Sequence, residues 1–404
     1  MLTSSPAPRP GDWGSSTPIS AEQMIGALVL LPCTEYRLKI LTMFLSVGEP
    51  APWFSAESNI NPLFHFSTVG GRYVILCFLN SSSDGVTQKM LEDLVRFQGA
   101  IDEPGQSWCF FAVSSDPEDK QQQRLTSSMP ELRIFWDFDH KISRLYRVID
   151  SEEVYHHCTY ILDERLRVLG IIPFGEKPEN HIPYLISILP KLPPIPLAGM
   201  AAPQAPVLVV PRIFESELCR KLIAYYHQHG GQESGFMREK DGKTIGIQDP
   251  TFKRRRDQTI LDPDLRSTAM FRIHNRLTPE IQKAFQFQAT RIERHIIACY
   301  ESSNHGFFRP HRDNTTKGTA HRRFAVSVNL NTGEYEGGML RFPEFGRQTY
   351  VAPAGGAVVF SCSLLHEATP VTAGRRYAYL PFLYDDAAAQ IREQNLQFVA
   401  SEGL

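Results

Sequence analysis

The residues best suited to metal chemistry lie in the C-terminal half of the chain. His311 and Asp313 stand two positions apart within residues 307–314. In an extended strand, residues two apart point to the same face, so both side chains can reach one metal ion. His366, in a later segment of strand character, can supply a third ligand. Two imidazoles and one carboxylate leave the opposite face of the metal open, which is the donor set of non-haem Fe(II) sites.

A histidine and an aspartate at this spacing also occur by chance, so a pair of surface residues is the alternative interpretation. Arg376 strengthens the metal hypothesis, since it follows His366 by ten positions (376 − 366). An arginine on the next strand offers a planar, bidentate fork to the far carboxylate of a dicarboxylate whose near end binds the metal. The sequence therefore predicts a metal site with a dicarboxylate anchor beside it.

The same half contains the elements that would position these residues. After a strand at 207–214 and a helix at 215–229, the helix start at Thr278 and an apolar stripe reaching Ile296 predict one long supporting helix. Glycine and proline turns then separate short apolar segments, at 323–330, 339–342, 349–352, 357–360 and 376–383. This spacing predicts an antiparallel sandwich or barrel.

The N-terminal half shows a different pattern, in which strands and helices alternate. We predict strands at 73–79 and 108–113, helices at 87–99, near 117–128 and at 180–189, and a hairpin of 159–162 with 168–172. Strand, helix, strand, helix is typical of a parallel sheet with crossover helices. The first half is therefore expected to be an α/β domain.

Composition divides the chain further. Six prolines fall between Pro190 and Pro206, so we predict a semi-rigid linker at 191–206 that separates a domain at 43–190 from one at 207–386. Residues 1–42 are expected to be a loosely ordered extension, with Met43 as a candidate natural start, and residues 387–404 a C-terminal tail.

Charge and cysteine content limit the classes of partner. The 404 residues hold 42 Lys and Arg against 44 Asp and Glu, so nucleic acid and membrane surfaces are not expected partners. Seven cysteines without a CxxC pair fit neither a disulfide framework nor a thiolate zinc site. The apolar run 24–33 is too short to span a bilayer. We therefore expect a cytoplasmic protein.

Several motifs of the second half occur in one order. The first is Phe308, three residues before His311. It is followed by a strand end, Asn329-Leu330-Asn331, and by a strand at 337–342 (Gly-Gly-Met-Leu-Arg-Phe). The last is His366 with Pro370-Val371. With Arg376, this run resembles the prolyl 4-hydroxylase-like Fe(II)/2-oxoglutarate-dependent dioxygenases. The resemblance implies a double-stranded β-helix (jelly-roll). It also implies hydroxylation of a substrate C–H bond with O₂, release of succinate and CO₂, and ascorbate as a candidate reductant.

Site residues are carried over by position. The resemblance implies that His311, Asp313 and His366 bind Fe(II) and that Arg376, with neighbouring Arg375 as its competitor, anchors 2-oxoglutarate. Alternation lets only one of the two arginines face the interior. The Arg-Tyr-Ala order favours Arg376 for that position.

Two further positions are assigned to the cosubstrate. Tyr300 lies where relatives often place a tyrosine against it, although a core tyrosine is the equal alternative. Asn329 replaces the aromatic hydroxyl of many relatives, and an amide can still donate. The presence of Asp313 favours hydroxylation over halogenation, because related halogenases lack this carboxylate.

Residues 45–190 resemble peroxiredoxins of thioredoxin fold. The resemblance rests on the segment 47–54, the strands at 73–79 and 108–113, and residues 159–163. Peroxiredoxins carry their peroxidatic cysteine at the start of the helix after the first core strand, where the helix N-terminus lowers the thiol pKa. Residues 80–87 contain no cysteine here. We therefore interpret this domain as a redox-inactive relative used for packing, homodimerisation or partner docking.

Substrate identity stays open at this level. A peptidyl proline, a free amino acid and a small metabolite all fit, and the selecting side chains lie in loops such as 231–260. The basic run 253–257 is interpreted as a solvated loop, with a substrate lid as the alternative. A non-enzymatic scaffold with a vestigial oxygenase half and a thiol peroxidase are the competing hypotheses for the whole chain.

Overall fold

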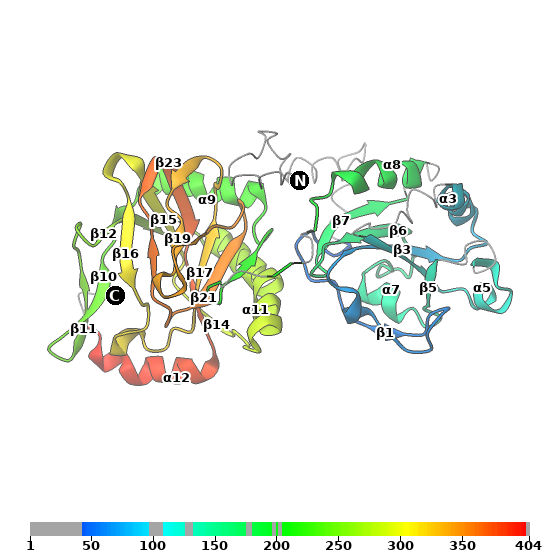
Figure 1. The fold of residues 1–404 in the computed structure, drawn as a ribbon. Helices are drawn as coiled ribbons and strands as arrows, with labels where there is room; N and C mark the ends of the chain where they lie inside the picture. Colours follow the sequence, from blue (N-terminus) through cyan, green and yellow to red (C-terminus); the bar gives the residue numbers. More distant parts are fainter. Residues whose placement is uncertain are drawn as a thin grey trace, which may run out of the picture.

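The computed structural model describes residues 43–96, 108–125, 132–174, 180–195, 199–200 and 204–400. Figure 1 shows two folded parts side by side, an α/β part and a larger part rich in strands. The predicted extension at 1–42 lies outside the described residues, as do parts of the predicted linker. Within the described ranges, every helix is too short or too polar to cross a bilayer.

The N-terminal part is built on a five-stranded mixed sheet. The strand order is β5-β4-β3-β6-β7, in which β3, β4 and β5 are parallel and β6 and β7 form an antiparallel hairpin. The bounds are β3 (Tyr73–Asn80), β4 (Trp108–Ser114), β5 (Arg133–Trp136), β6 (Cys158–Leu162) and β7 (Val168–Pro173). A small pair, β1 (Ser55–Ala56) and β2 (Phe64–His65), lies outside this sheet.

Both faces of this sheet are covered, which explains the unbroken apolar sequence of β3. Its odd-numbered residues, such as Ile75, pack under α3 and α8, and its even-numbered residues, such as Leu76, pack with α7. The helices are α3 (Gly85–Arg96), α5 (Pro117–Gln121), α7 (Lys141–Leu145) and α8 (His181–Ile188). The predicted α/β thioredoxin-like domain is confirmed.

The C-terminal part contains two antiparallel sheets. The larger follows the order β14-β24-β17-β23-β15-β13-β9, and the smaller follows β12-β16-β22-β19-β20. The larger sheet comprises β14 (Arg291–Glu293), β24 (Phe382–Tyr384), β17 (Phe324–Asn329), β23 (Val371–Tyr379), β15 (Ile296–Glu301), β13 (Arg256–Thr259) and β9 (Gln232–Glu233). The smaller comprises β12 (Lys253–Arg254), β16 (Phe307–His311), β22 (His366–Ala368), β19 (Leu340–Arg341) and β20 (Thr349–Tyr350).

Further strands and four helices complete this part. β21 (Ala357–Ser361) pairs with β17 and with β8 (Leu208–Val210), and β18 (Tyr335–Gly337) pairs with β23. A separate hairpin is formed by β10 (Phe236–Lys240) and β11 (Lys243–Ile247). The helices are α9 (Ser216–His229), α10 (Pro263–Arg272), α11 (Thr278–Phe285) and α12 (Asp386–Asn395).

Strand alternation separates two cores in the larger sheet. Cys299 and Tyr377 point toward the helices, whereas Tyr300 and Ala378 point toward the smaller sheet and pack with its Phe308. This is the layout of the predicted double-stranded β-helix, which is confirmed. It turns the even-numbered residues of β15, and Arg376 and Ala378 of β23, toward the space between the sheets.

One helix prediction is wrong. α11 ends at Phe285, and Gln286 takes a left-handed φ of 52° that stops the helix. Ile292 and Ile296 lie in β14 and β15, so the apolar stripe spans two kinds of element. The supporting helical region instead extends backward through a π-helical turn (Ile273–Leu277) into α10, whose start is capped by the Asp262 side chain.

The segment that we predict as a C-terminal tail contains most of α12. The two parts of the chain touch through the β6–β7 hairpin. Arg167 is fully buried and donates to the backbone oxygens of Pro211 and Gly48, both at 2.6 Å. Arg212 forms an ion pair with Asp163 of the same hairpin.

Candidate metal centre and cavity

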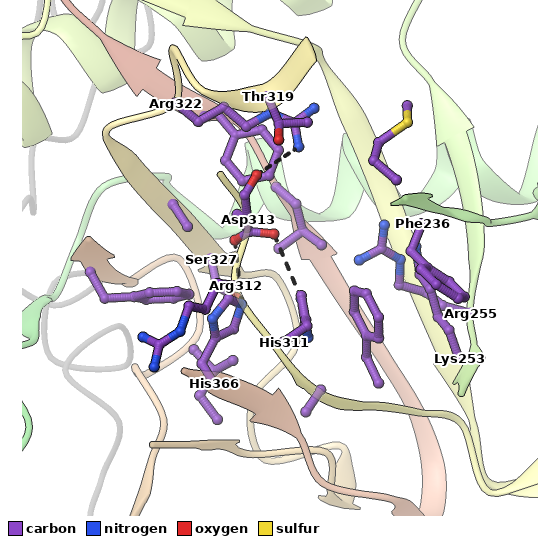
Figure 2. Close-up of a pocket in the computed structure, with 18 of the residues that line it drawn as sticks. Phe236, Lys253, Arg255, His311, Arg312, Asp313, Thr319, Arg322, Ser327 and His366 are labelled. Carbon is purple, nitrogen blue, oxygen red and sulfur yellow. Dashed lines mark hydrogen bonds and ion pairs between the residues drawn. The ribbon is translucent and has the colours of Figure 1, made fainter. Parts of the chain in front are cut away.

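The folded chain brings together His311, Asp313 and His366. β16 and β22 pair antiparallel with His311 opposite His366, and Asp313 follows the end of β16. One ligand atom from each residue lies within 4.8 Å of the other two. His311 Nε2 is 3.6 Å from Asp313 Oδ1, and His366 Nε2 is 3.3 Å from Asp313 Oδ2. Figure 2 shows the three side chains pointing toward one another.

Backbone carbonyls orient both imidazoles. His311 Nδ1 donates to the oxygen of Arg309 at 2.7 Å, and His366 Nδ1 donates to the oxygen of Leu364 at 3.0 Å. A carbonyl oxygen can only accept, so each Nδ1 carries the proton and each Nε2 keeps its lone pair for a metal. The imidazole rings are also packed against phenyl rings. The ring centroids of Phe308 and His311 are 3.5 Å apart, and those of Phe360 and His366 are 4.5 Å apart.

The protonation states suit metal binding. Burial, together with the neighbouring His366 ring, lowers the pKa of His311 to about 3, so this imidazole is neutral at pH 7. Burial acts to raise the pKa of Asp313, but His366, His311 and Arg322 outweigh it and hold that pKa below its ordinary value. A neutral imidazole and a carboxylate are donors that fit Fe(II), and His366 offers a second imidazole.

A cavity of about 290 Å³ opens beside these residues, between the two sheets. Arg376 reaches it from β23 and is only 2 % exposed. Its guanidinium donates to Ser327 Oγ at 2.8 Å and to Asn329 Oδ1 at 3.2 Å. Arg375 points the other way, with its side chain 55 % exposed and paired with Glu301. Of the two neighbouring arginines, the structure places Arg376 in the cavity.

The two other predicted cosubstrate residues differ in position. Tyr300 is buried and lines the cavity, with its ring 5.2 Å from the Arg376 guanidinium. Asn329 lies behind Arg376, since its Oδ1 accepts from that arginine and its amide nitrogen donates to Ala352 O at 3.2 Å. Asn329 therefore contacts the arginine and is not among the residues that line the cavity.

Ser327, Lys253 and Arg255 are among the lining residues that sequence reasoning did not assign to the site. Ser327 precedes Asn329 by two on β17, so alternation could have identified it. Lys253 and Arg255 belong to the basic run that we interpreted as a solvated loop, and that interpretation is wrong for both. They are 6 % and 5 % exposed and line the cavity near Phe236 (Figure 2). The pairing of β12 with β16 and of β13 with β15 turns them inward.

The thiols of the N-terminal sheet are expected to be inert. Burial raises the pKa of Cys77 to about 12 and that of Cys109 to about 11, so neither forms appreciable thiolate near neutral pH. We expect native protein treated with hydrogen peroxide at pH 7 to show no sulfenic acid at Cys77, Cys109 or Cys158 by mass spectrometry after trapping. Urea-unfolded protein is the positive control, and sulfenic acid at Cys77 in the native chain would contradict the prediction.

Comparisons with known proteins match the two parts separately. A family model described as "2OG-Fe(II) oxygenase superfamily" matches residues 295–384. A PKHD-type hydroxylase from Synechococcus sp. (strain JA-2-3B'a(2-13)) is 30% identical over 89 residues, which are 20% of this chain and 39% of that protein. The chain thus spans about two fifths of the length of this curated relative. A Pseudomonas putida prolyl-4-hydroxylase structure is 19% identical, covering 44% of this chain and 91% of that one, with a TM-score of 0.33.

The N-terminal part matches a second model, described as "AhpC/TSA family", over residues 47–170. A Xanthomonas campestris peroxiredoxin Q structure is 14% identical, covering 34% of this chain and 90% of that one, with a TM-score of 0.31. The two parts of the chain are therefore similar to two different families, residues 47–170 to the AhpC/TSA family and residues 295–384 to the 2OG-Fe(II) oxygenase superfamily.

Proposed function

We propose that the C-terminal domain is an Fe(II)- and 2-oxoglutarate-dependent hydroxylase that releases succinate and CO₂. The observation that carries this proposal is the position of Arg376 in the same cavity as the His311, Asp313 and His366 cluster. A dicarboxylate needs both a metal for one end and a fixed cation for the other. The superfamily match over residues 295–384 supports the same conclusion.

The proposed roles follow from the contacts. His311, Asp313 and His366 would hold Fe(II), which supplies one-electron and O₂ chemistry when bound. Arg376 would bind the far carboxylate of 2-oxoglutarate, and Tyr300 would pack beside it. Ser327 and Asn329 orient Arg376 through its hydrogen bonds. Phe308 and Phe360 exclude water from the imidazoles by packing against them.

The remaining features belong to the same proposal. The hydroxylated C–H bond would belong to a free amino acid, a peptidyl proline or a small metabolite, with ascorbate as the reductant. The N-terminal domain would serve packing, homodimerisation or partner docking, because residues 80–87 lack a cysteine. A cytoplasmic location fits the widely spaced cysteines.

Two other functions compete with this one. A thiol peroxidase is disfavoured because burial raises the pKa values of Cys77 and Cys109. A vestigial scaffold is disfavoured because the three ligands and Arg376 are all present and oriented. The residues that the proposal needs for binding a metal and a dicarboxylate are therefore all in place.

Conversion of 2-oxoglutarate to succinate tests the proposal. We expect the full chain to form succinate in the presence of Fe(II) and O₂, with further stimulation by the right compound from a panel of amino acids, proline-containing peptides and small acids. The matched control is the same protein with Fe(II) removed by a chelator. If the chain binds no iron and forms no succinate with the whole panel, the vestigial-scaffold hypothesis replaces the proposal.

A further inference from the structure

The cavity carries more positive charge than the proposed cosubstrate uses. Cationic side chains line it from several elements, whereas Asp313 is the one carboxylate among its described lining residues. Three of the arginines have carboxylate partners. Arg255 pairs with Asp257, Arg322 with Glu293 and Arg312 with Glu344.

Arg294 differs from these three, because among the described residues it forms no ion pair. Arg238 and Arg376 also line the cavity without an ion pair in the described ranges, but Arg238 is exposed and Arg376 is the proposed cosubstrate anchor. Its Nε donates to the backbone oxygen of Leu380 at 3.1 Å, and its guanidinium lies 4.2 Å from the centre of the Phe382 ring. These contacts fix the side chain but use only one of its five N–H groups. The two terminal NH₂ groups remain available to the cavity that Arg294 lines.

The surroundings of Arg294 favour an added anion. Burial, followed by the positive charges of Arg322 and Arg255, lowers the pKa of Arg294 to about 10. Asp257 and Glu293 act in the opposite direction, but each is hydrogen-bonded to another arginine. Arg294 is partly exposed, and a bound anion stabilises a partly buried cation that lacks its own counter-charge.

Lys253 adds a second cation without a carboxylate partner in the described part of the chain. Its Nζ donates to Ser234 Oγ at 2.7 Å and to Gly235 O at 2.5 Å, and lies 4.7 Å from the Phe308 ring. Burial and then Arg255 lower the pKa of Lys253, and Arg294 lowers it further. The two side chains therefore share one electropositive region.

Arg294 also differs from Arg376 in its place along the sheet. Arg376 stands opposite Tyr300 in the β15–β23 pair, whereas Arg294 bonds to Leu380, four residues beyond Arg376 (380 − 376). At the rise per residue of a strand, the backbones of Arg376 and Leu380 are about 13 Å apart. The two arginines thus approach the cavity from separate positions.

The backbone of Arg294 is also held in an uncommon conformation. Arg294 adopts a φ of 55°, in the left-handed region that L-residues with a Cβ seldom occupy. Such strain persists where the surrounding structure holds it, and it concentrates at ligand-binding positions. Here the strained residue is a cavity arginine that forms no ion pair among the described residues.

We propose that Arg294, supported by Lys253, binds a carboxylate or phosphate group of the substrate, which is therefore a small anionic molecule. The identification of the anion as part of the substrate rests on the proposed hydroxylase function, whereas anion binding itself does not. It selects among the open substrate classes, favouring a free amino acid or an acidic metabolite over a proline inside a peptide.

Anion binding can be tested without turnover, with inorganic phosphate as the probe. The background is the full chain carrying Arg376→Met, so that the proposed cosubstrate anchor cannot bind the probe. We expect phosphate to raise the Tm saturably at constant ionic strength, and Arg294→Met in that background to abolish the rise. Methionine retains a Cβ, so the left-handed backbone is equally strained in both chains.

Two further variants make this test decisive. Arg291→Met removes an exposed arginine paired with Asp386 and should leave the phosphate effect unchanged. If Arg294→Met does not fold, Arg294→Lys keeps the charge, loses the fork and should weaken phosphate binding about tenfold. A phosphate effect that is absent from the background chain, or equal with and without Arg294, overturns the proposal.

Turnover then distinguishes the source of the anion. Succinate formation is compared for carboxylic acids, phosphate monoesters and the uncharged amide or alcohol matched to each. We expect stimulation by one anionic class, and a fall in its kcat/KM of about ten- to a hundredfold with Arg294→Met, while the KM for 2-oxoglutarate is unchanged. Equal stimulation by the uncharged partners overturns the inference. A saturable phosphate effect without any succinate formation refutes the hydroxylase function and leaves the anion site standing.

Discussion

The chain with His311→Ala should lose its bound iron and all iron-dependent succinate formation. His311 offers one of the three proposed donor atoms, and its Nδ1–H···O bond to Arg309 leaves Nε2 with a lone pair for a metal. Loss of an outer hydrogen-bond partner alone weakens metal sites about 10- to 100-fold, so loss of the ligand itself should cost more than about 100-fold in affinity. Titration calorimetry with Mn²⁺, a redox-inert stand-in, measures the change.

A second histidine provides the control for that experiment. His229 is exposed on α9, and its hydrogen bond within the described residues is to the backbone oxygen of Tyr225, so His229→Ala should bind Mn²⁺ as the unaltered chain does. Unchanged circular dichroism would show that His311→Ala is folded. Full metal affinity in folded His311→Ala would refute the assignment of this residue as a ligand.

Replacing Arg376 by methionine should weaken 2-oxoglutarate binding about ten- to a hundredfold, because a buried charged hydrogen-bond donor to a carboxylate is lost. Metal affinity should remain, since Arg376 contacts Ser327 and Asn329 and none of the three proposed ligands. The measurement is the KM for 2-oxoglutarate in succinate formation, together with Mn²⁺ affinity. Arg376→Lys should recover part of the loss because it keeps the charge without the fork.

Arg375→Met is the matched control, since it removes the same group from the adjacent position of β23. Arg375 is more than half exposed and faces Glu301 on the opposite side of the strand. Its replacement should change the KM for 2-oxoglutarate by less than about twofold, because exposed ion pairs contribute little. The reverse outcome, a large effect of Arg375→Met and none of Arg376→Met, would exchange the proposed roles.

Local periodicity predicted much of the candidate site. His311 and Asp313 are two apart at and just beyond the end of one strand, and Arg376 lies on the strand that follows the strand of His366. Alternation also limits the choice between Arg375 and Arg376 to one residue per face. These relations depend on neighbours in sequence, so they are visible before folding.

Other features could not be predicted in this way. The apolar residues from Ile281 to Ile296 have helical spacing, yet Gln286 breaks the helix and Ile292 enters a strand, because tertiary packing overrides a short periodic pattern. The run from Lys253 to Asp257 has the composition of a solvated loop. Its inward-facing members are held by Asp257, Ser234 and Gly235, which compensate part of their desolvation.

The sequence by itself determined which residues could bind a metal and a dicarboxylate, and that residues 80–87 have no cysteine to act as a peroxidatic thiol. Only the tertiary structure decided that Lys253, Arg255 and Arg294 face the same cavity as those ligands. The physical reason is that a charged side chain can face the interior only where partner groups compensate its desolvation. Those partners, such as Leu380 O for Arg294, come from distant strands that only folding brings together.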